Sequence, residues 1–419
     1  MYSYHNNIDG EFDIGIIGGG ASGIFSSIVA KDESDLSVAV FESEDRILKK
    51  VLKTGNGKCN LTNKDLCLSN FHGNPLILKS VFSKCPQSLT LNIFKNLGIR
   101  VVFDENGKCF PASYQASSIV DGLRFGASKR GVKIYAETEI VKIEKKDEKF
   151  LLRADNRYNF LCSKVIFSTG GLAGLKKKEE NFFRVLKDLN VNIIKPFPTL
   201  VQLRLVETDP FKSMEGCKWE CGVILNVDGK NTLVENGEIL FTNYGISGNA
   251  ILNISREAVK NLNENKKVKI LIDLLPEMTD VEIKDELTFR IKRFGDYDLE
   301  FLFNGWINKR IGVIFLKSLG FNMNDKINVL TEKDVEKIIN NIHSFTFTVA
   351  NHNGFLNAQV MAGGVSVDDV DFETLQHKRI KGLYFAGEIL DIDGKSGGYN
   401  LQWAWSSGYV SAFYAVKSF

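Results

Sequence analysis

A glycine-rich turn between a short apolar strand and a helix constrains the fold of this chain more than any other feature. Residues 12–17 (FDIGII) predict a buried strand, residues 21–31 a helix, and residues 37–41 (SVAVF) a second buried strand. The turn after the first strand reads G-x-G-x-x-G, with its glycines at 18, 20 and 23. Such a β-α-β unit begins a parallel sheet, so the sequence predicts an α/β fold with a Rossmann-like domain.

The same turn, together with an acidic residue after the second strand, predicts a dinucleotide site. Gly18 permits the tight turn, Gly20 lets the backbone approach a pyrophosphate, and Gly23 lets the helix pack closely on the strand. Glu42 ends the second strand, where its carboxylate can accept a hydrogen bond from a ribose 2′-hydroxyl and would repel a 2′-phosphate. The pattern therefore favours FAD or NAD over NADP at this position.

A change of pattern near residue 195 predicts an insert. KPFPTL (195–200) contains two of the seven prolines, and it is followed by alternating strands with expected turns at Asp228-Gly229 and Asn236-Gly237. Helix start signals then occur at Thr279 and Thr331, each with an acidic residue three positions later. We expect one discontinuous domain formed by residues 1–194 and 349–419, interrupted by an α+β insert over 195–348 with a β-rich, barrel-like part and a helical part.

Two further segments are expected at the carboxyl edge of the sheet, where ligands bind in such folds. Residues 48–63 (LKKVLKTGNGKCNLTN) are polar and rich in backbone donors. Residues 382–408 contain a short strand, a second pair of carboxylates (Glu388 and Asp391), and a glycine pair that opens a helix. A second helix N-terminus suits a long ligand with a ribityl chain, a pyrophosphate and a ring, so these residues favour FAD over NAD. A second G-x-G-x-x-G after a strand is absent from the sequence, which argues against a dedicated nicotinamide domain.

Composition argues against several other classes. The 53 Lys and Arg balance 51 Asp and Glu, so we expect no nucleic-acid partner and no anionic membrane partner. No apolar run reaches the length of a membrane span, and no positive segment precedes the apolar residues 14–30, so a cytoplasmic location is expected. The seven cysteines form no C-x-x-C pair, so we expect reduced thiols and no metal site.

Several blocks together resemble a known family. They are GIIGGGASG (15–23), TGNGKCNLTN (54–63), GKCFPASYQASSIVDGL (107–123), FSTGG (167–171), LFTNYGISGNAILNIS (240–255), MAGGVSV (361–367) and the 382–408 segment. In these blocks the chain resembles the BaiN-like flavoproteins, a bacterial FAD-binding family with many members described as aminoacetone-oxidase-family enzymes. The resemblance implies a two-dinucleotide-binding-type FAD domain interrupted by an insert, and a cofactor that lies along the blocks on either side of that insert.

The expected cofactor contacts follow from the glycine turn and from this resemblance. They are Gly18, Gly20, Ala21, Ser22, Gly23, Glu42, Ser43, Lys50, Thr54, Gly55, Cys59, Asn60, Ile140, Val141, Thr169, Gly170, Gly387, Glu388, Asp391, Gly398, Tyr399, Asn400 and Leu401. Two positions depart from the family pattern. Lys58 replaces an arginine, and the loop after Gly171 (GLAGLKKKEENFF) is charged and poorer in glycine, so contacts from that loop are not carried over.

The sequence leaves the residues on the substrate side open. Cys59 is either a redox-active thiol or a packed side chain, and Trp403 and Trp405 either wall the flavin or fill the core. Tyr244 and Ser247 either contact the substrate or belong to a β-turn, while Asn351 and His352 either line the substrate or form a solvated turn.

Three functions remain open at this point. The first is an FAD oxidoreductase that acts on a small organic substrate and is reoxidised by O2, as an amine oxidase is. The second is a reductase, for example of an enone, to which NAD(P)H binds transiently as the electron donor. The third is a non-enzymatic FAD-stabilised scaffold or redox sensor. A flavoprotein that modifies tRNA is disfavoured by the balanced charge, and the oligomeric state is not predicted.

Overall fold

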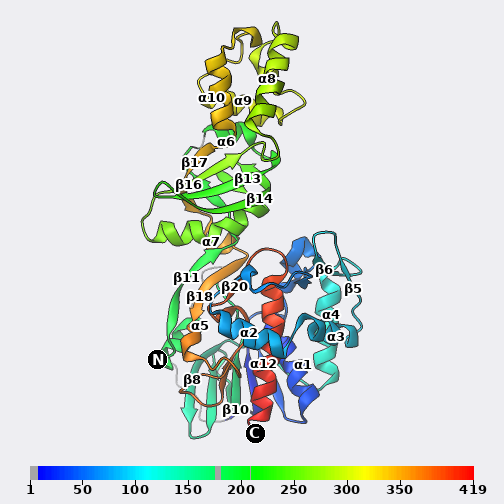
Figure 1. The fold of residues 1–419 in the computed structure, drawn as a ribbon. Helices are drawn as coiled ribbons and strands as arrows, with labels where there is room; N and C mark the ends of the chain where they lie inside the picture. Colours follow the sequence, from blue (N-terminus) through cyan, green and yellow to red (C-terminus); the bar gives the residue numbers. More distant parts are fainter. Residues whose placement is uncertain (1–7, 175–180, 208) are drawn as a thin grey trace. The chain divides into compact units, whose positions relative to one another are not determined.

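The structure is a computed structural model that describes residues 8–174, 181–207 and 209–419. The chain forms two compact units (Figure 1). Unit 1 consists of the residues up to Phe197 together with Val360–Phe419, and unit 2 of Pro198–Gln359. The boundary expected at 348/349 falls inside strand β17 (Phe345–His352), because this strand pairs with strands of unit 2 on both sides.

Unit 1 is built on a mixed sheet of seven strands. Its order is β7-β2-β1-β10-β9-β8, and β19 also pairs with β10. The bounds are β1 Gly10–Ile17, β2 Val38–Phe41, β7 Lys133–Tyr135, β8 Ile140–Lys146, β9 Lys149–Ala154, β10 Asn159–Phe167 and β19 Leu383–Phe385. The pairs around β1, β2, β7, β10 and β19 are parallel, whereas β9 and β8 add an antiparallel ribbon at one edge. The predicted Rossmann-type α/β fold is confirmed.

Helix α1 (Ala21–Glu33) and the C-terminal helix α12 (Tyr399–Lys417) pack against each other over this sheet (Figure 1). Small residues permit the close approach, since the Ser26 hydroxyl donates a hydrogen bond to the Gly408 carbonyl at 2.9 Å. Beside them, the fully buried rings of Phe25, Phe94 and Trp405 meet one another. Burial of each such ring stabilises the fold by roughly 1.5–3 kcal/mol. This packing holds α1 and α12 in place relative to the sheet.

The remaining elements of unit 1 are shorter. The helices are α2 Pro75–Lys84, α3 Gln87–Asn96, α4 Ala116–Lys129 and α5 Asn181–Asp188. The strands form three small sheets: β3 (Thr62–Asn63) with β6 (Lys108–Pro111) and β5 (Val101–Phe103), β4 (Phe71–His72) with β20 (Asp393–Gly394), and β11 (Ile193–Thr199) with β18 (Val360–Val365). Two of these sheets matter for the site, because β3 and β20 flank the start of α12.

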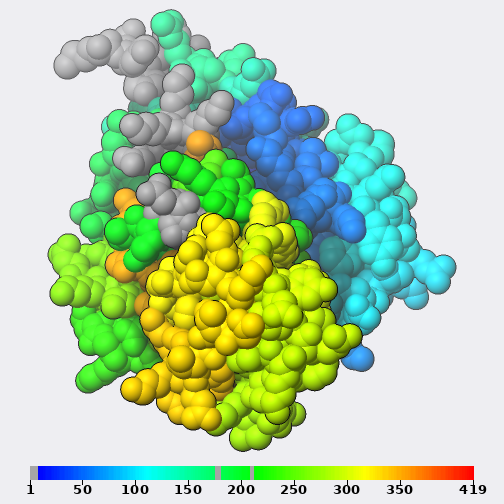
Figure 2. Space-filling view, turned by 90° about the horizontal axis from the view of Figure 1, so that it is seen from above, coloured from blue at the N-terminus to red at the C-terminus, as the bar shows by residue number. Residues whose placement is uncertain are grey.

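Unit 2 contains a closed six-stranded barrel and a cluster of helices. The barrel order is β12-β15-β14-β13-β16-β17, with β12 Leu203–Leu205, β13 Lys218–Val227, β14 Lys230–Thr242, β15 Gly245–Ser247 and β16 Val268–Asp273. The helices are α6 Asp209–Met214, α7 Asn249–Asn263, α8 Asp280–Phe294, α9 Lys309–Ser318, α10 Glu332–Ile342 and α11 Gly354–Asn357. Figure 2 looks onto α8–α10, whose atoms form one rounded, closely packed surface.

In unit 2, the sequence predicted two helix starts correctly and one turn wrongly. Thr279 and Thr331 form capping boxes with Glu282 and Asp334, as their spacing predicted. The turn predicted at Asn236-Gly237 is wrong, because these residues lie inside β14 and pair with β13. Continuous pairing along β13 outweighs the local turn preference of the Asn-Gly pair.

Candidate functional site

The glycine turn places the N-terminus of α1 at the carboxyl end of β1 in unit 1. Gly18 has a φ of 101°, and a Cβ there would lie 2.5 Å from the Ser168 carbonyl oxygen. A Cβ on Gly23 would lie 1.9 Å from the Gly18 carbonyl oxygen, so only glycine permits this packing. A Cβ on Gly20 would meet no atom within 4 Å. The turn is therefore closely packed on its inner side and open at the helix N-terminus.

Glu42 directs its carboxylate onto this turn. It accepts hydrogen bonds from the backbone N–H of Gly19 at 2.7 Å and of Glu44 at 2.9 Å, and the hydroxyl of the exposed Ser43 donates to it at 3.2 Å. Burial raises the pKa of Glu42 above its usual range, while these hydrogen bonds act in the opposite direction. The carboxylate is thus held rigidly beside the open helix N-terminus.

The start of β8 lies near Glu42 as expected. The backbone N–H of Thr138 donates to the Glu42 carbonyl at 2.8 Å, two residues before β8 begins. Ile140 is buried, and Val141 occupies a register shift between Ile140 and Lys142. The irregular strand start therefore borders the acidic end of β2.

Residues 48–63 follow this edge and turn back into unit 1. The Leu48 N–H donates to the Gly19 carbonyl at 2.8 Å, which fastens the segment to the glycine turn. A short 3-10 segment (Val51–Gly57) follows, with Thr54 extended and Gly55 at a φ of 56°. Asn60 then accepts a hydrogen bond from the Cys109 N–H at 3.0 Å through its side-chain oxygen. Lys58 places its ammonium 5.7 Å from the centre of the Tyr114 ring.

Cys59 is a packed side chain. It is fully buried, and burial raises the pKa of its thiol to about 11. A thiol with that pKa is protonated near neutral pH, and the thiolate is the reactive form. Of the two interpretations left open by the sequence, this environment favours packing.

The C-terminal segment reaches the start of α1 through Gly387. The Ser22 hydroxyl donates to the Ala386 carbonyl at 3.3 Å, and a Cβ on Gly387 would lie 2.5 Å from that hydroxyl oxygen. The Ser407 hydroxyl accepts a hydrogen bond from the Gly387 N–H at 2.9 Å. Ser22 and Gly387 are therefore brought together although their positions in the sequence are far apart, and Ala21, the first residue of α1, directly precedes Ser22.

Lys50 and Glu388 meet in an ion pair at 2.9 Å. Glu388 also accepts a hydrogen bond from the Met361 N–H at 2.8 Å, and a Cβ on Gly170 would lie 3.9 Å from its carboxylate. The neighbouring Asp391 accepts a hydrogen bond from the Gly363 N–H at 2.9 Å. Both carboxylates therefore hold the start of β18 in place.

Thr169, next to Gly170, carries a buried hydroxyl oxygen that bonds to no residue the structure describes. Its neighbour Ser168 donates to the carbonyls of Ile17 and Gly18 at 3.0 and 3.1 Å. A buried hydroxyl without a partner is costly unless a ligand or water satisfies it. The Thr169 hydroxyl is thus available for a hydrogen bond with a ligand.

The start of α12 forms a second helix N-terminus in unit 1. Gly398 has a φ of 99°, and a Cβ there would lie 2.5 Å from the Thr62 carbonyl oxygen. The Asn400 side chain binds both backbone groups of Gly394 at 2.8 Å, and the Tyr399 hydroxyl accepts a hydrogen bond from Asn70 at 3.2 Å. Leu401 packs against the core. These side chains support the helix start, so any ligand there would meet its first backbone N–H groups.

The two tryptophans of α12 belong to the core. The Trp403 indole N–H donates to the Gly387 carbonyl and the Trp405 indole N–H to the Leu61 carbonyl, each at 3.1 Å, and both rings are at most 1% exposed. Their role is to tie α12 to residues expected at the cofactor. Ser168, Met361 and Ser407 hold the same segments but were not among the expected contacts, although they lie in the FSTGG block, the MAGGVSV block and the 382–408 segment.

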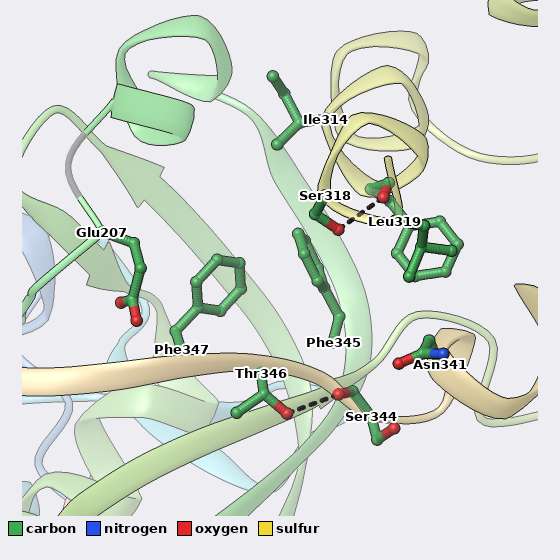
Figure 3. Close-up of a pocket in the computed structure, with 10 residues that line it drawn as sticks. Glu207, Ile314, Ser318, Leu319, Asn341, Ser344, Phe345, Thr346 and Phe347 are labelled. Carbon is green, nitrogen blue, oxygen red and sulfur yellow. Dashed lines mark hydrogen bonds between the residues drawn. The ribbon is translucent and has the colours of Figure 1, made fainter. Parts of the chain in front are cut away.

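A cavity of about 280 Å3 lies in unit 2 between α9 and β17. Figure 3 shows Phe345 and Phe347 on one side of it, Ile314 and Ser318 on the other, and Glu207 beside Phe347. Its polar groups are engaged: Glu207 accepts from the Thr348 N–H, and the hydroxyls of Ser318 and Thr346 donate to nearby carbonyls. These hydrogen bonds hold the polar side chains around the cavity in place.

Within the described ranges, no group of three or more His, Cys, Asp or Glu side chains could hold a metal ion. A helix both long enough and apolar enough to cross a membrane is likewise not found in the part of the chain that is described. The loop after Gly171 lies partly outside the described residues, at 175–180.

The fold defines this molecule as a Rossmann-type protein with a second unit inserted. Its strand, glycine turn and helix lie on a mixed sheet whose central pairs are parallel. Residues 12–414 match the family described as the HI0933-like protein Rossmann domain, and the chain belongs to this family.

Two examples among the curated relatives that match this chain each cover nearly all of it. One is the 3-dehydro-bile acid delta(4,6)-reductase of Clostridium scindens, 34% identical over 96% of this chain and 99% of the relative. The other is the ribosomal RNA dihydrouridine synthase of Haemophilus influenzae, 30% identical over 98% of each chain. Among solved structures, the 3-ketosteroid delta1-dehydrogenase of Sterolibacterium denitrificans shares the fold, with a TM-score of 0.53 and 12% identity over 98% of this chain and 100% of that one.

Proposed function

We propose that this chain is an FAD-dependent oxidoreductase that reduces a carbon–carbon double bond conjugated to a carbonyl group. The observation that carries the proposal is what the two relatives have in common. A 3-dehydro, delta(4,6) compound is by its name a ketone with nearby double bonds, and uridine carries a ring double bond next to a carbonyl. A reductase of the first and a synthase of dihydrouridine both yield a saturated carbon–carbon bond.

The residues of unit 1 fit FAD. The open side of Gly20 and the free N–H groups at the start of α1 suit a pyrophosphate, and the held carboxylate of Glu42 suits ribose hydroxyls. The unpartnered Thr169 hydroxyl offers a hydrogen bond further along the same edge. When bound, FAD would supply two-electron hydride chemistry, with NAD(P)H as the electron donor and an unsaturated carbonyl compound as the acceptor.

The other predicted contacts would support this cofactor in two ways. Backbone N–H groups of Tyr399, Asn400 and Leu401 give positive potential at the start of α12, which would favour negative charge on a flavin ring bound there. We expect the remaining proposed contacts along the same edge of unit 1: Ala21, Ser22, Ser43, Lys50, Thr54, Gly55, Cys59, Asn60, Ile140, Val141, Gly170, Gly387, Glu388, Asp391 and Gly398.

A uridine in ribosomal RNA is the second candidate substrate, and the Haemophilus influenzae relative favours it. This relative counts against the expectation that nucleic acid is not a partner. However, acidic residues outnumber basic ones in residues 198–359, and the whole chain is balanced at +2. RNA phosphates require a positive surface, so we place a small unsaturated carbonyl compound first.

The test is an anaerobic two-stage assay on the purified, FAD-loaded chain. NADH or NADPH is added first, and loss of the visible flavin absorbance is followed. A small enone such as benzalacetone, an amine, or unmodified ribosomal RNA is then offered, and the product is identified by mass spectrometry. We expect NAD(P)H to bleach the flavin and the enone to restore its colour with a gain of two hydrogens.

Other results would separate the alternatives. Reduction by an amine, followed by peroxide formation in air, would support an oxidase and contradict the proposal. Recovery of colour only with RNA, with dihydrouridine in the digest, would assign the second candidate. A flavin that no donor reduces would leave a scaffold or sensor as the function.

A further inference from the structure

The cavity between α9 and β17 belongs to unit 2 alone. All the residues that line it fall within Pro198–Gln359 (Figure 3). Its volume of about 280 Å3 is close to the lower end of ligand pockets, which is roughly 300 Å3. The cavity therefore has room for a small organic molecule, such as one with a single ring and a short chain.

Three buried phenylalanine rings form the apolar wall of this cavity. Phe345 meets Phe347 edge to face with ring centres 4.4 Å apart, and Phe315 meets Phe345 edge to face at 5.5 Å. Figure 3 shows Ile314 on the opposite side. The face of an aromatic ring carries negative potential, so a wall of this kind accommodates a cation better than an anion.

The hydroxyl groups around the cavity use their protons on backbone carbonyls. Ser318 donates to the Phe315 carbonyl at 2.6 Å. Thr346 donates to the Ser344 carbonyl at 2.7 Å, and the Ser344 hydroxyl donates to the Asn340 carbonyl at 3.2 Å. Because a hydroxyl has one proton and two lone pairs, these three groups retain only the capacity to accept hydrogen bonds.

Glu207 adds a negative charge to this set of acceptors. Both of its carboxylate oxygens accept from the same donor, the Thr348 N–H, at 3.2 and 3.0 Å. A carboxylate has about four lone-pair sites, and this one forms no ion pair with any residue that the structure describes. The remaining hydrogen-bond capacity and the charge of the lining therefore both favour a ligand that donates hydrogen bonds and is positively charged.

We propose that this cavity binds a small organic ammonium ion, with the ammonium group at Glu207 and the apolar part against the phenylalanine rings. A contact of the same kind already exists in unit 2. The Lys337 ammonium donates to the Leu319 carbonyl at 2.6 Å and lies 5.4 Å from the centre of the Phe321 ring. The proposal goes beyond the function proposed above, because neither a flavin nor NAD(P)H takes part in this binding.

Other classes of small ligand fit the lining less well. A carboxylate or a phosphate would meet the like charge of Glu207, and it would find acceptors where it needs donors. A hydrocarbon would fill the apolar part but would separate Glu207 from water without offering it a hydrogen bond, which is costly. An ammonium group avoids both penalties, since it brings three donors and the opposite charge.

The experiment compares three compounds that share one ring and a short chain and differ in the polar group. They are phenethylamine, phenethyl alcohol and phenylpropionate. Their binding to the full-length, FAD-loaded chain is measured by titration calorimetry without O2 or NAD(P)H, and the flavin spectrum is recorded throughout. The variants are Glu207→Gln and Ile314→Trp, with Glu220→Gln on the exposed side of β13 as the matched control. The melting temperature of each variant is recorded.

We expect the unaltered chain to bind phenethylamine about tenfold more tightly than phenethyl alcohol, and phenylpropionate more weakly than either. Glu207→Gln keeps an acceptor for the Thr348 N–H but removes the charge, so the amine should lose about tenfold in affinity while the alcohol is unaffected. Ile314→Trp fills the space and should weaken both. Glu220→Gln should change neither affinity.

Four results would overturn the proposal. Equal affinity for the amine and the alcohol in the unaltered chain is the first, and this comparison requires no substitution. A preference for the amine that survives Glu207→Gln in a folded variant is the second, and amine binding that a folded Ile314→Trp variant leaves unchanged is the third. Bleaching or a shift of the flavin spectrum during the amine titration is the fourth, since it would indicate that the amine binds at the flavin instead.

Discussion

Polar side chains interact differently at the start of α1 in unit 1 and at Arg204 in the barrel of unit 2. In unit 1, Glu42, Glu388 and Asn400 all bind backbone groups of neighbouring segments, so a ligand would meet mainly backbone N–H groups and an open glycine. In unit 2, Arg204 is oriented by Asn353 and Tyr244, yet its charged end has no described partner. The first arrangement presents backbone donors between fixed side chains, whereas the second presents a charged side chain.

The largest effect should come from adding a side chain on the closely packed side of the glycine turn. Gly23→Ala would place a Cβ 1.9 Å from the Gly18 carbonyl oxygen, so α1 must move away from β1. Overpacking of this kind costs on the order of 3 kcal/mol, and we expect a lower melting temperature together with loss of flavin. Thermal unfolding of the apo-protein measures this. An unchanged melting temperature would show that the turn adapts easily to a side chain at this position. The glycine turn of unit 1 would then not be rigid.

Gly20→Ala separates ligand binding from folding at the same turn. A Cβ on Gly20 meets no protein atom within 4 Å, and its φ of −78° is open to alanine. The apo-protein should therefore keep its melting temperature, while FAD affinity falls about tenfold because the methyl group occupies the space of the pyrophosphate. Fluorescence titration of the apo-protein with FAD measures the affinity. Unchanged affinity in this variant would argue that the cofactor lies elsewhere.

The difference between these glycines shows what a sequence can predict. Their spacing after an apolar strand was enough for the Rossmann-type fold and for the start of α1, because both depend on local backbone geometry. The roles of Glu388 and Asn400 were not readable, since their partners at Met361 and Gly394 are brought to them only by tertiary packing. The Asn236-Gly237 turn failed for the same reason, because pairing with β13 overrides a local preference.

A smaller effect is expected in the helical part of unit 2, where local signals worked well. Thr279 caps α8, accepting from the Glu282 N–H at 3.3 Å, while Glu282 accepts from the Thr279 N–H at 2.8 Å. Thr279→Ala should lower the stability of the chain by about 1 kcal/mol in urea unfolding, and Thr279→Ser should restore it. Equal losses in both variants would mean that the methyl group of Thr279 matters more than its hydroxyl.

The same cap predicts a pH dependence. Hydrogen bonds from the Thr279 N–H and hydroxyl hold the pKa of Glu282 below its usual range. A carboxyl with a lowered pKa in the folded state contributes stability above its unfolded value of 4.5 and loses it as the pH falls through the folded value. The difference in stability between the unaltered chain and Thr279→Ala should therefore shrink as the pH falls below 4.5.

The smallest effect on the fold is expected from labelling cysteines, which compares a packed and an exposed position within unit 1. Cys67 is exposed, and a hydrogen bond with the Ser69 hydroxyl lowers the pKa of its thiol, whereas burial raises the pKa of Cys59 to about 11. Since the thiolate is the reactive form, iodoacetamide at pH 8 should label Cys67 first and leave Cys59 untouched, with flavin content preserved. Mass spectrometry of the digest measures both sites. Early labelling of Cys59 would contradict its packed environment and revive a redox-active thiol beside the glycine turn. Protection of Cys59 would instead support its packed environment in unit 1.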